Sequence, residues 1–183
     1  INSLGIAGTL AWDSETLDFE SKLIGSFNLE NLILAASIAI ELNISRQSIL
    51  EGIKNCENID GRLHLVKNKS NQMIFLDYAH SPDAYFRTLK ALKENFSRPL
   101  KVLFGAGGGR DKSKRPKMAE MVEKYSIECY LAPDNPRFEN IELINSDVIK
   151  GFSNENHHIF NDREEALKFA LTNLKSDEIL IIF

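Results

Sequence analysis

Residues 100–122 read LKVLFGAGGGRDKSKRPKMAEMV, and this stretch decides the fold class. The apolar run from Leu100 to Phe104 is short and ends at a glycine, which predicts a buried strand. A glycine-rich loop follows, and after it Met118 and Val122 recur at helical spacing. A buried strand, a tight loop and a helix in this order are typical of a sheet whose strands run parallel.

The same alternation continues on both sides of this stretch. Ser81 can cap a helix that has Pro82 in its first turn, and Asp162 with Glu165 resembles a capping box. Repeated strand–helix units predict an α/β fold with a mostly parallel sheet covered by helices. We expect further strands at 73–76, 128–131, 158–160 and 178–183, and further helices from 82, over 141–152 and from 163.

The residues before Arg62 follow a different pattern. Segments 6–10 and 16–19 predict a small hairpin. Segment 28–43 is apolar nearly all round, which is typical of a buried helix. Ser45 can cap a second helix that runs to about residue 56, and Gly61 marks a turn. We therefore expect two parts, one before and one after this turn.

Composition excludes several classes of protein. The 183 residues are 43% hydrophobic and 26% charged, which excludes intrinsic disorder and a fibrous protein. The net charge of -4 argues against a broad nucleic-acid-binding surface, so we expect no nucleic-acid partner. The longest apolar run, 32–42, is shorter than the roughly 18 residues that cross a membrane, so we expect no membrane partner.

Cysteine content and the chain ends also carry expectations. Cys56 and Cys129 lack metal-binding spacing, so we expect two buried, reduced thiols. No signal peptide is recognisable, which favours the cytoplasm. The sequence starts at Ile1 without a methionine and stops at Phe183 inside an apolar run, so we expect a piece of a longer protein.

The loop at 105–116 has the composition of an anion site. Its four glycines allow a ligand to approach the backbone closely. It is neither a phosphate-binding P-loop nor a dinucleotide fingerprint, because Asp111 precedes Lys112 and because Arg110 stands where the third glycine belongs. Loop and helix start carry five cations against one acid, which favours phosphate or carboxylate. The alternative is a solvated basic turn.

Two other loops follow predicted strands. The tetrapeptide Asp134-Asn135-Pro136-Arg137 combines an arginine, which can fork onto a carboxylate, with oxygen acceptors for an ammonium group. That combination suits an amino acid, although an ordinary turn would have the same residues. In the loop at 77–82, Asp77 could bind ribose hydroxyls and His80 could contact a phosphate. The alternative is a capped helix start.

Taken together, these motifs resemble the Mur ligases of peptidoglycan synthesis. The similarity covers nearly the whole chain, and within the family it is to the members that add meso-diaminopimelate. Five motifs carry it, in this order: 27–31, 61–62, 77–82, 107–116 and 134–137.

The resemblance implies both an architecture and a reaction. It assigns residues 1–60 to the end of a central ATP-binding domain and 61–183 to a C-terminal Rossmann-like domain. Family members use ATP and magnesium to convert a side-chain carboxylate of UDP-N-acetylmuramoyl-L-alanyl-D-glutamate into an acyl phosphate. The amine of the incoming amino acid then attacks it.

Site residues follow from the resemblance position by position. It implies that Arg110 and the tetrapeptide 134–137 bind meso-diaminopimelate. A buried arginine that forks onto the far carboxylate would be unpaired with lysine, which would reject lysine. The resemblance also places four residues near the nucleotide, and it implies no catalytic or metal-binding residue in this chain. These four are Asn31, Arg62, Asp77 and His80.

Some family features are missing. The family's phosphate loop and its Gly-Lys-Gly-His-Glu motif are absent, so we expect this chain alone to have no ligase activity. His64, Gly109 and Ser81 replace a usual Glu, Asp and Thr. Alternatives are another Mur ligase, a folylpolyglutamate synthetase or a non-catalytic nucleotide-binding domain, and the tetrapeptide 134–137 favours the diaminopimelate type over the first two.

Overall fold

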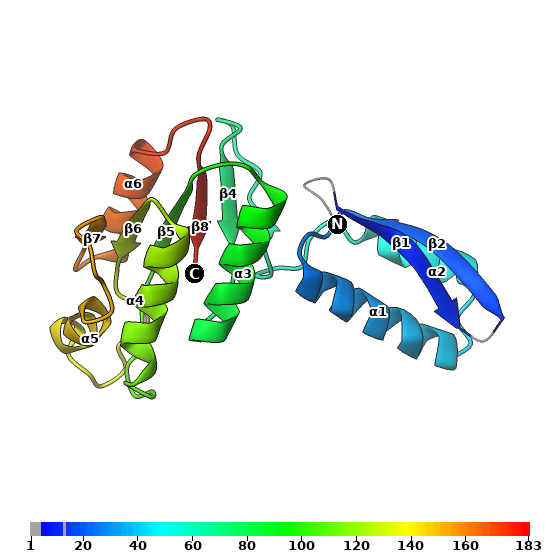
Figure 1. Cartoon of the computed structure of the whole chain (residues 1–183), viewed down its shortest axis with the longest axis horizontal. Helices are drawn as coiled ribbons and strands as arrows, with labels where there is room; N and C mark the ends of the chain where they lie inside the picture. Colours follow the sequence, from blue (N-terminus) through cyan, green and yellow to red (C-terminus); the bar gives the residue numbers. More distant parts are fainter. Residues whose placement is uncertain (1–4, 13) are drawn as a thin grey trace. The chain divides into compact units, whose positions relative to one another are not determined.

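The computed structural model describes residues 5–12 and 14–183, which divide into two compact units. The first unit comprises the residues up to Ile59 together with Glu94–Phe96. The second comprises Asp60–Lys93 and Ser97–Phe183. Figure 1 shows the elements of each unit. The assignment of 1–60 and 61–183 to two domains of a larger ligase stays a prediction.

The first unit is a hairpin packed with two helices, as the sequence predicts. Its strands are antiparallel, and Ser45 caps the second helix by accepting a hydrogen bond from the Ser48 backbone N–H at 3.2 Å. Leu32 and Ile49 from the two helices pack against buried residues of the hairpin. The elements are β1 (Ile6–Trp12), β2 (Glu15–Ser21), α1 (Ser26–Glu41) and α2 (Arg46–Asn55).

Helix α1 is not buried on all sides, so that expectation is wrong. Only Asn28, Leu32 and Ala36 are buried, because only one face of the helix packs on the hairpin and α2. Leu34 and Ile38 are 62% and 52% exposed. A helix that is apolar on all its faces is therefore not necessarily buried on all of them, as α1 shows.

The second unit contains a six-stranded sheet in the order β3-β4-β8-β5-β6-β7. Its strands are parallel except for the short edge strand β3, which pairs antiparallel with β4. The mostly parallel α/β fold predicted from the sequence is confirmed. The strands are β3 (His64–Leu65), β4 (Met73–Leu76), β5 (Leu100–Phe104), β6 (Glu128–Leu131), β7 (His157–Ile159) and β8 (Ile179–Ile182).

Helices pack against this sheet. Helix α6 covers Leu103 and Tyr130 on one face, and Figure 1 shows α3 and α4 side by side in front of the sheet. In α3, Tyr85, Leu89 and Leu92 are fully buried, as their spacing predicts. The helices are α3 (Pro82–Asn95), α4 (Lys114–Tyr125), α5 (Ile141–Ile149) and α6 (Arg163–Thr172). None of the described helices has the length and apolarity that a membrane crossing needs.

Two local expectations need correction. Helix α5 ends at Ile149, three residues before the expected end, because the chain turns at Gly151. A Cβ atom on Gly151 would lie 1.9 Å from the Pro116 carbonyl oxygen, so the turn packs directly against the start of α4. Cys129 is buried, which raises the pKa of its thiol to about 12, but Cys56 is only half-buried.

The parallel topology decides where a ligand can bind. Strands β4, β5 and β6 end at Leu76, Phe104 and Leu131, and their carboxyl ends lie at one edge of the sheet. Three loops start from this edge, and they are the loops that the sequence singles out. Ligands of parallel sheets bind beyond this edge.

Candidate functional site

A pocket of about 500 Å³ opens at the carboxyl edge of the sheet. The loops after β4, β5 and β6 supply most of its walls, and Tyr85 and Phe183 contribute a stacked pair of rings 4.1 Å apart. Four of the predicted site residues line it together: His80, Arg110, Asp134 and Arg137.

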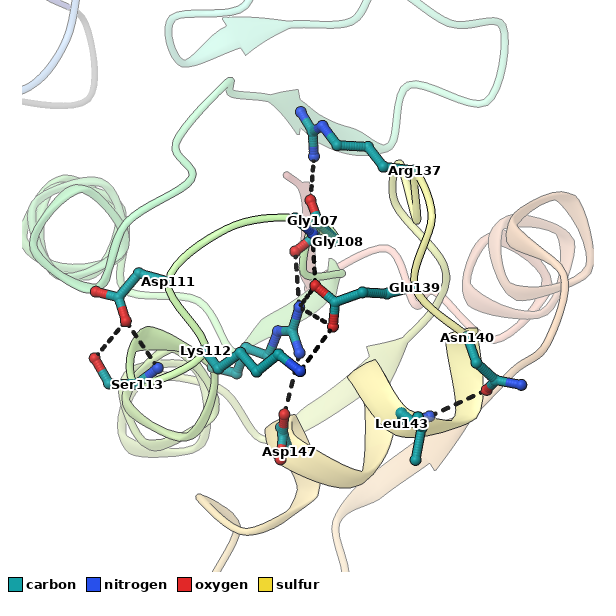
Figure 2. Close-up of polar contacts among 12 residues, drawn as sticks. Gly107, Gly108, Asp111, Lys112, Ser113, Arg137, Glu139, Asn140, Leu143 and Asp147 are labelled. Atoms are coloured by element: carbon teal, nitrogen blue, oxygen red, sulfur yellow. Dashed lines mark hydrogen bonds and ion pairs between the residues drawn. The ribbon is translucent and has the colours of Figure 1, made fainter.

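Two of these loops interlock. The Gly108 N–H donates to the Asn135 carbonyl at 2.9 Å, and the Arg137 guanidinium donates to the Gly108 carbonyl at 2.7 Å. Figure 2 shows the contact between Arg137 and Gly108. A Cβ atom on Gly108 would lie 1.9 Å from the Pro136 carbonyl oxygen. The glycine is therefore required by the close approach of the loops.

The tetrapeptide 134–137 adopts a strained turn that directs its arginine. Arg137 has a φ of 51°, a left-handed conformation uncommon for residues other than glycine. The Asn135 side chain accepts from the Arg137 N–H at 3.1 Å, and the Pro136 carbonyl accepts from the Glu139 N–H at 3.0 Å. Asn135 and Pro136 thus shape the turn without lining the pocket, while Asp134 and Arg137 line it.

Arg115 is not part of a solvated cationic loop, which corrects the sequence-based count of free cations. It is 2% exposed, and its guanidinium contacts both carboxylate oxygens of Glu139 at 3.0 Å and one of Asp147 at 3.1 Å. Lys112 also pairs with Glu139, at 3.3 Å. Among the described residues, Arg110 has no such carboxylate partner, so its charge remains available at the pocket.

Hydrogen bonds keep the acids around the loop ionised. The Gly109 N–H donates to Glu139 at 2.6 Å and, together with Arg115 and Lys112, lowers the pKa of that carboxyl group. The hydroxyl and N–H of Ser113 donate to Asp111 and lower its pKa. Figure 2 shows Asp111 placed against Ser113 at the start of α4. The Asp111 carboxylate therefore offsets part of the positive potential at this helix N-terminus.

The remaining predicted nucleotide contacts are dispersed. The buried Asp77 accepts hydrogen bonds from the N–H groups of Leu63 at 2.8 Å and Ala79 at 2.9 Å, so it shapes its loop. Arg62 is exposed and does not line the pocket. Asn31 lies in the first unit, where it lines an apolar groove of about 350 Å³. Their contacts with a nucleotide stay predictions.

Sequence reasoning missed the partners of Arg115. One signal was present, because Arg115 shares a helical face with Met118, Ala119 and Val122, all of which are buried. Glu139 and Asp147 carried no comparable signal, since they lie 24 and 32 residues away along the chain.

The side chains of the pocket can bind both carboxylate and ammonium groups. Guanidinium groups at Arg110 and Arg137 can bind carboxylate, and the Asp134 carboxylate can accept from an ammonium group. Among residues 5–12 and 14–183, no group of three His, Cys, Asp or Glu side chains could hold a metal ion.

The chain is similar to known proteins over its whole length. Residues 61–183 match the family model described as Mur ligase, glutamate ligase domain. The UDP-N-acetylmuramoyl-L-alanyl-D-glutamate–2,6-diaminopimelate ligase of Bacillus cereus is 34% identical over 182 residues, which are 100% of this chain and 37% of that protein. The enzyme of the same name from Vibrio vulnificus is 37% identical over 161 residues, which are 87% of this chain and 33% of that protein.

A solved structure agrees. A structure of a ligase of that name superposes with a TM-score of 0.66 at 33% identity, and the match covers 99% of this chain and 37% of that chain. The chain thus spans well under half the length of the relatives that it matches.

Proposed function

The chain belongs to the Mur ligase family, and from that premise we propose that its second unit binds the incoming amino acid of an ATP-dependent amide ligase. The proposed amino acid is meso-diaminopimelate, and the acceptor is UDP-N-acetylmuramoyl-L-alanyl-D-glutamate. Two relatives whose names contain this acceptor and 2,6-diaminopimelate support the proposal.

One observation carries the assignment of substrate: Arg110, Asp134 and Arg137 line the same pocket. The pocket is also lined by Lys114, by Asp111, which accepts from Ser113, and by the ion-paired Arg115. The two substrate arginines and Asp134 match the two carboxylates and an ammonium group of an amino acid that carries an additional carboxylate. One N–H group of the Arg137 guanidinium donates to the Gly108 carbonyl, and its other N–H groups can donate to a ligand.

The charges also explain how lysine would be rejected. Diaminopimelate differs from lysine by a carboxylate at its far end, and this group would pair with the arginines. With lysine bound, a guanidinium would lose contact with water and gain no partner, which is costly. The stacked rings of Tyr85 and Phe183 supply an apolar wall for the carbon chain between the two ends.

The role of this chain in the reaction is to position the attacking amine. ATP, when bound, would supply the phosphoryl group that activates the D-glutamate carboxylate. We propose Asn31, Arg62, Asp77 and His80 as nucleotide contacts, and Asp77 also holds the loop that carries His80. We assign magnesium to no residue of this chain.

Calorimetric titration of the natural protein that contains this sequence tests the proposal. We expect meso-diaminopimelate to bind about 10- to 100-fold more tightly than L-lysine, because a charged hydrogen-bonded contact contributes about 1.5–3 kcal/mol. Arg137→Ala should remove most of this preference, because diaminopimelate loses a charged partner and lysine no longer leaves that guanidinium unpaired.

Arg87→Ala provides the matched control. Arg87 is an exposed arginine of α3 that pairs with Asp83 at 2.9 Å and does not line the pocket. It should keep the full preference for diaminopimelate. Equal affinity for the two amino acids in the unaltered protein would exclude the proposed substrate.

A further inference from the structure

A buried arginine, Arg115, forms ion pairs beside the proposed substrate arginines and lines the same pocket. Arg115 is among the most buried large side chains of the described chain, and it comes from the first turn of α4. It joins three segments, since it contacts the Gly107 carbonyl at 3.3 Å, Glu139 at 3.0 Å and Asp147 at 3.1 Å. Figure 2 shows Gly107, Glu139 and Asp147 converging from separate parts of the chain.

Glu139 is placed to act on both loops at once. It follows Arg137 by two residues, and it accepts from the N–H of Gly109, the residue before Arg110. Its carboxylate also contacts Arg115 and Lys112. The carboxylate of Glu139 thus fixes the backbone beside Arg110, and its own backbone N–H, which donates to the Pro136 carbonyl at 3.0 Å, fixes the turn beside Arg137.

The network is not arranged for stability alone. The Arg115 Nε atom is buried and has no hydrogen-bond partner among the described residues. Buried ion pairs are often no more stabilising than well-packed apolar residues, and an unsatisfied donor adds a further cost. The arrangement therefore favours a role in geometry.

We propose that Glu139 and Arg115 form a positioning pair that sets the direction of Arg137 and thereby the affinity for the second carboxylate of the amino acid. The chain of contacts runs from Arg115 and Glu139 to the backbone of Gly107 and Gly109, and from Gly108 to the Arg137 guanidinium. This inference rests on the proposed function of the pocket.

A mutant cycle between Glu139 and Arg137 tests the proposal. Glu139→Gln keeps an acceptor for Gly109 and loses the charge, and it should weaken meso-diaminopimelate binding roughly tenfold. In the complete ligase, KM for diaminopimelate should rise by a similar factor while KM for ATP is unchanged. In an Arg137→Ala background, Glu139→Gln should cause no further loss, because its effect passes through Arg137.

Glu123→Gln is the matched control. Glu123 accepts from the N–H groups of Ser153 at 2.8 Å and Asn154 at 2.9 Å, and it does not line the pocket. It should leave ligand affinity unchanged, because Glu123 is connected to neither substrate arginine. If Glu139→Gln fails to fold, Arg115→Lys, which keeps the charge but loses the planar fork, is taken through the same cycle.

The outcomes separate this inference from the proposed function. Equal losses from Glu139→Gln with and without Arg137, or no loss at all, would overturn the positioning role. If Arg137→Ala itself leaves diaminopimelate affinity unchanged, the proposed substrate is wrong. The positioning role is then wrong as well, because it rests on that substrate.

Discussion

Two buried cations hold carboxylates at opposite ends of the same sheet, and they differ in what they connect. At the amino end, Lys101 of β5 contacts Glu128 at 2.8 Å and Glu178 at 3.1 Å, and it donates to the Asn173 carbonyl at 2.8 Å. At the carboxyl end, Arg115 contacts Glu139 and Asp147. The first network joins strands and the turn before β8, whereas the second joins loops around a pocket.

Their hydrogen-bond satisfaction also differs. An ammonium group has three donors, and Lys101 has a partner for each of them. Arg115 leaves Nε without a partner among the described residues. The comparison agrees with our proposal that the Arg115 network positions side chains of the pocket, whereas the fully satisfied Lys101 network connects elements of the sheet.

Removal of the amino-end cation should give the largest change in stability. Lys101→Met leaves Glu128 and Glu178 without their shared counter-ion, and we expect a loss of about 3–5 kcal/mol in the free energy of unfolding. Denaturant unfolding measures it. Diaminopimelate affinity of the folded fraction should be unchanged, because the pocket is at the other end of the sheet.

Lys175→Met is the control for this change. Lys175 is exposed and lies 3.9 Å from Glu178, so its removal should cost less than about 0.5 kcal/mol. If both variants lose the same stability, the Lys101 network has no special structural role.

Overpacking of the interlocked loops should have the next largest effect. Gly108→Ala places a Cβ atom 1.9 Å from the Pro136 carbonyl oxygen, and we expect a loss of about 1–3 kcal/mol together with weaker diaminopimelate binding. Gly52→Ala is the contrasting variant, since a Cβ atom there meets nothing within 4 Å. In the interior of α2 it should stabilise the first unit by about 0.5–1 kcal/mol. A well-tolerated Gly108→Ala would contradict the close loop contact.

Removal of a helix cap should give a smaller loss of stability. It should also distinguish α5, which begins beside Glu139, from α6. Asn140 caps α5 by accepting from the N–H of Glu142 at 2.7 Å, and Asp162 caps α6 by accepting from Glu165 at 2.7 Å. Replacing either by alanine should cost about 1 kcal/mol in thermal unfolding. Only Asn140→Ala should also weaken diaminopimelate binding, because Asn140 directly follows Glu139 (Figure 2). If both substitutions weakened diaminopimelate binding equally, the proposed link between the start of α5 and the pocket would be contradicted.

Acid pH should lower the free energy of unfolding of the second unit gradually, and we expect this to be the smallest of the effects. The pKa values of Glu139 and Asp147 are lowered by their hydrogen bonds, and that of Glu128 is lowered because hydrogen bonds from Lys101, Tyr130 and His158 outweigh burial. A lowered pKa contributes stability above the ordinary value of 4.5 for glutamate, and this stability is lost as pH falls through the folded value. The free energy of unfolding should therefore fall below this pH, with a shallower slope in Glu139→Gln. An unchanged slope would show that Glu139 titrates normally.

The predictable parts of the fold are those with strong local signals. Strands β4, β5 and β6 have the predicted bounds because each is a short, mostly apolar run. Strand β4 lies between Gln72 and Asp77, and β5 lies between Pro99 and Gly105. The end of α5 was missed because Gly151 is placed by contact with Pro116, which is distant along the chain. The exposed face of α1 was missed because apolar composition does not state which residues cover it.

The features of the site also divide into those that the sequence predicts and those that it does not. The alternation of strands and helices was enough to predict that the loops at 105–116 and 134–137 each follow a strand of a parallel sheet, and the family resemblance gave both to one site. Arg110 and Arg137 do line one pocket. The pairing of Arg115 with Glu139 was not predictable, since opposite charges occur throughout this sequence and nothing local selects one pair. Burial of Asp77 depends on Leu63, a partner 14 residues earlier.

The sequence by itself determined the α/β alternation, the edge of the sheet where a ligand can bind, and the kinds of side chain at that edge, because all three depend on local pattern and strand direction. Only the tertiary structure decided which cations there are neutralised and which stay available. That choice depends on contacts between residues far apart in the chain, whose geometry no local pattern encodes.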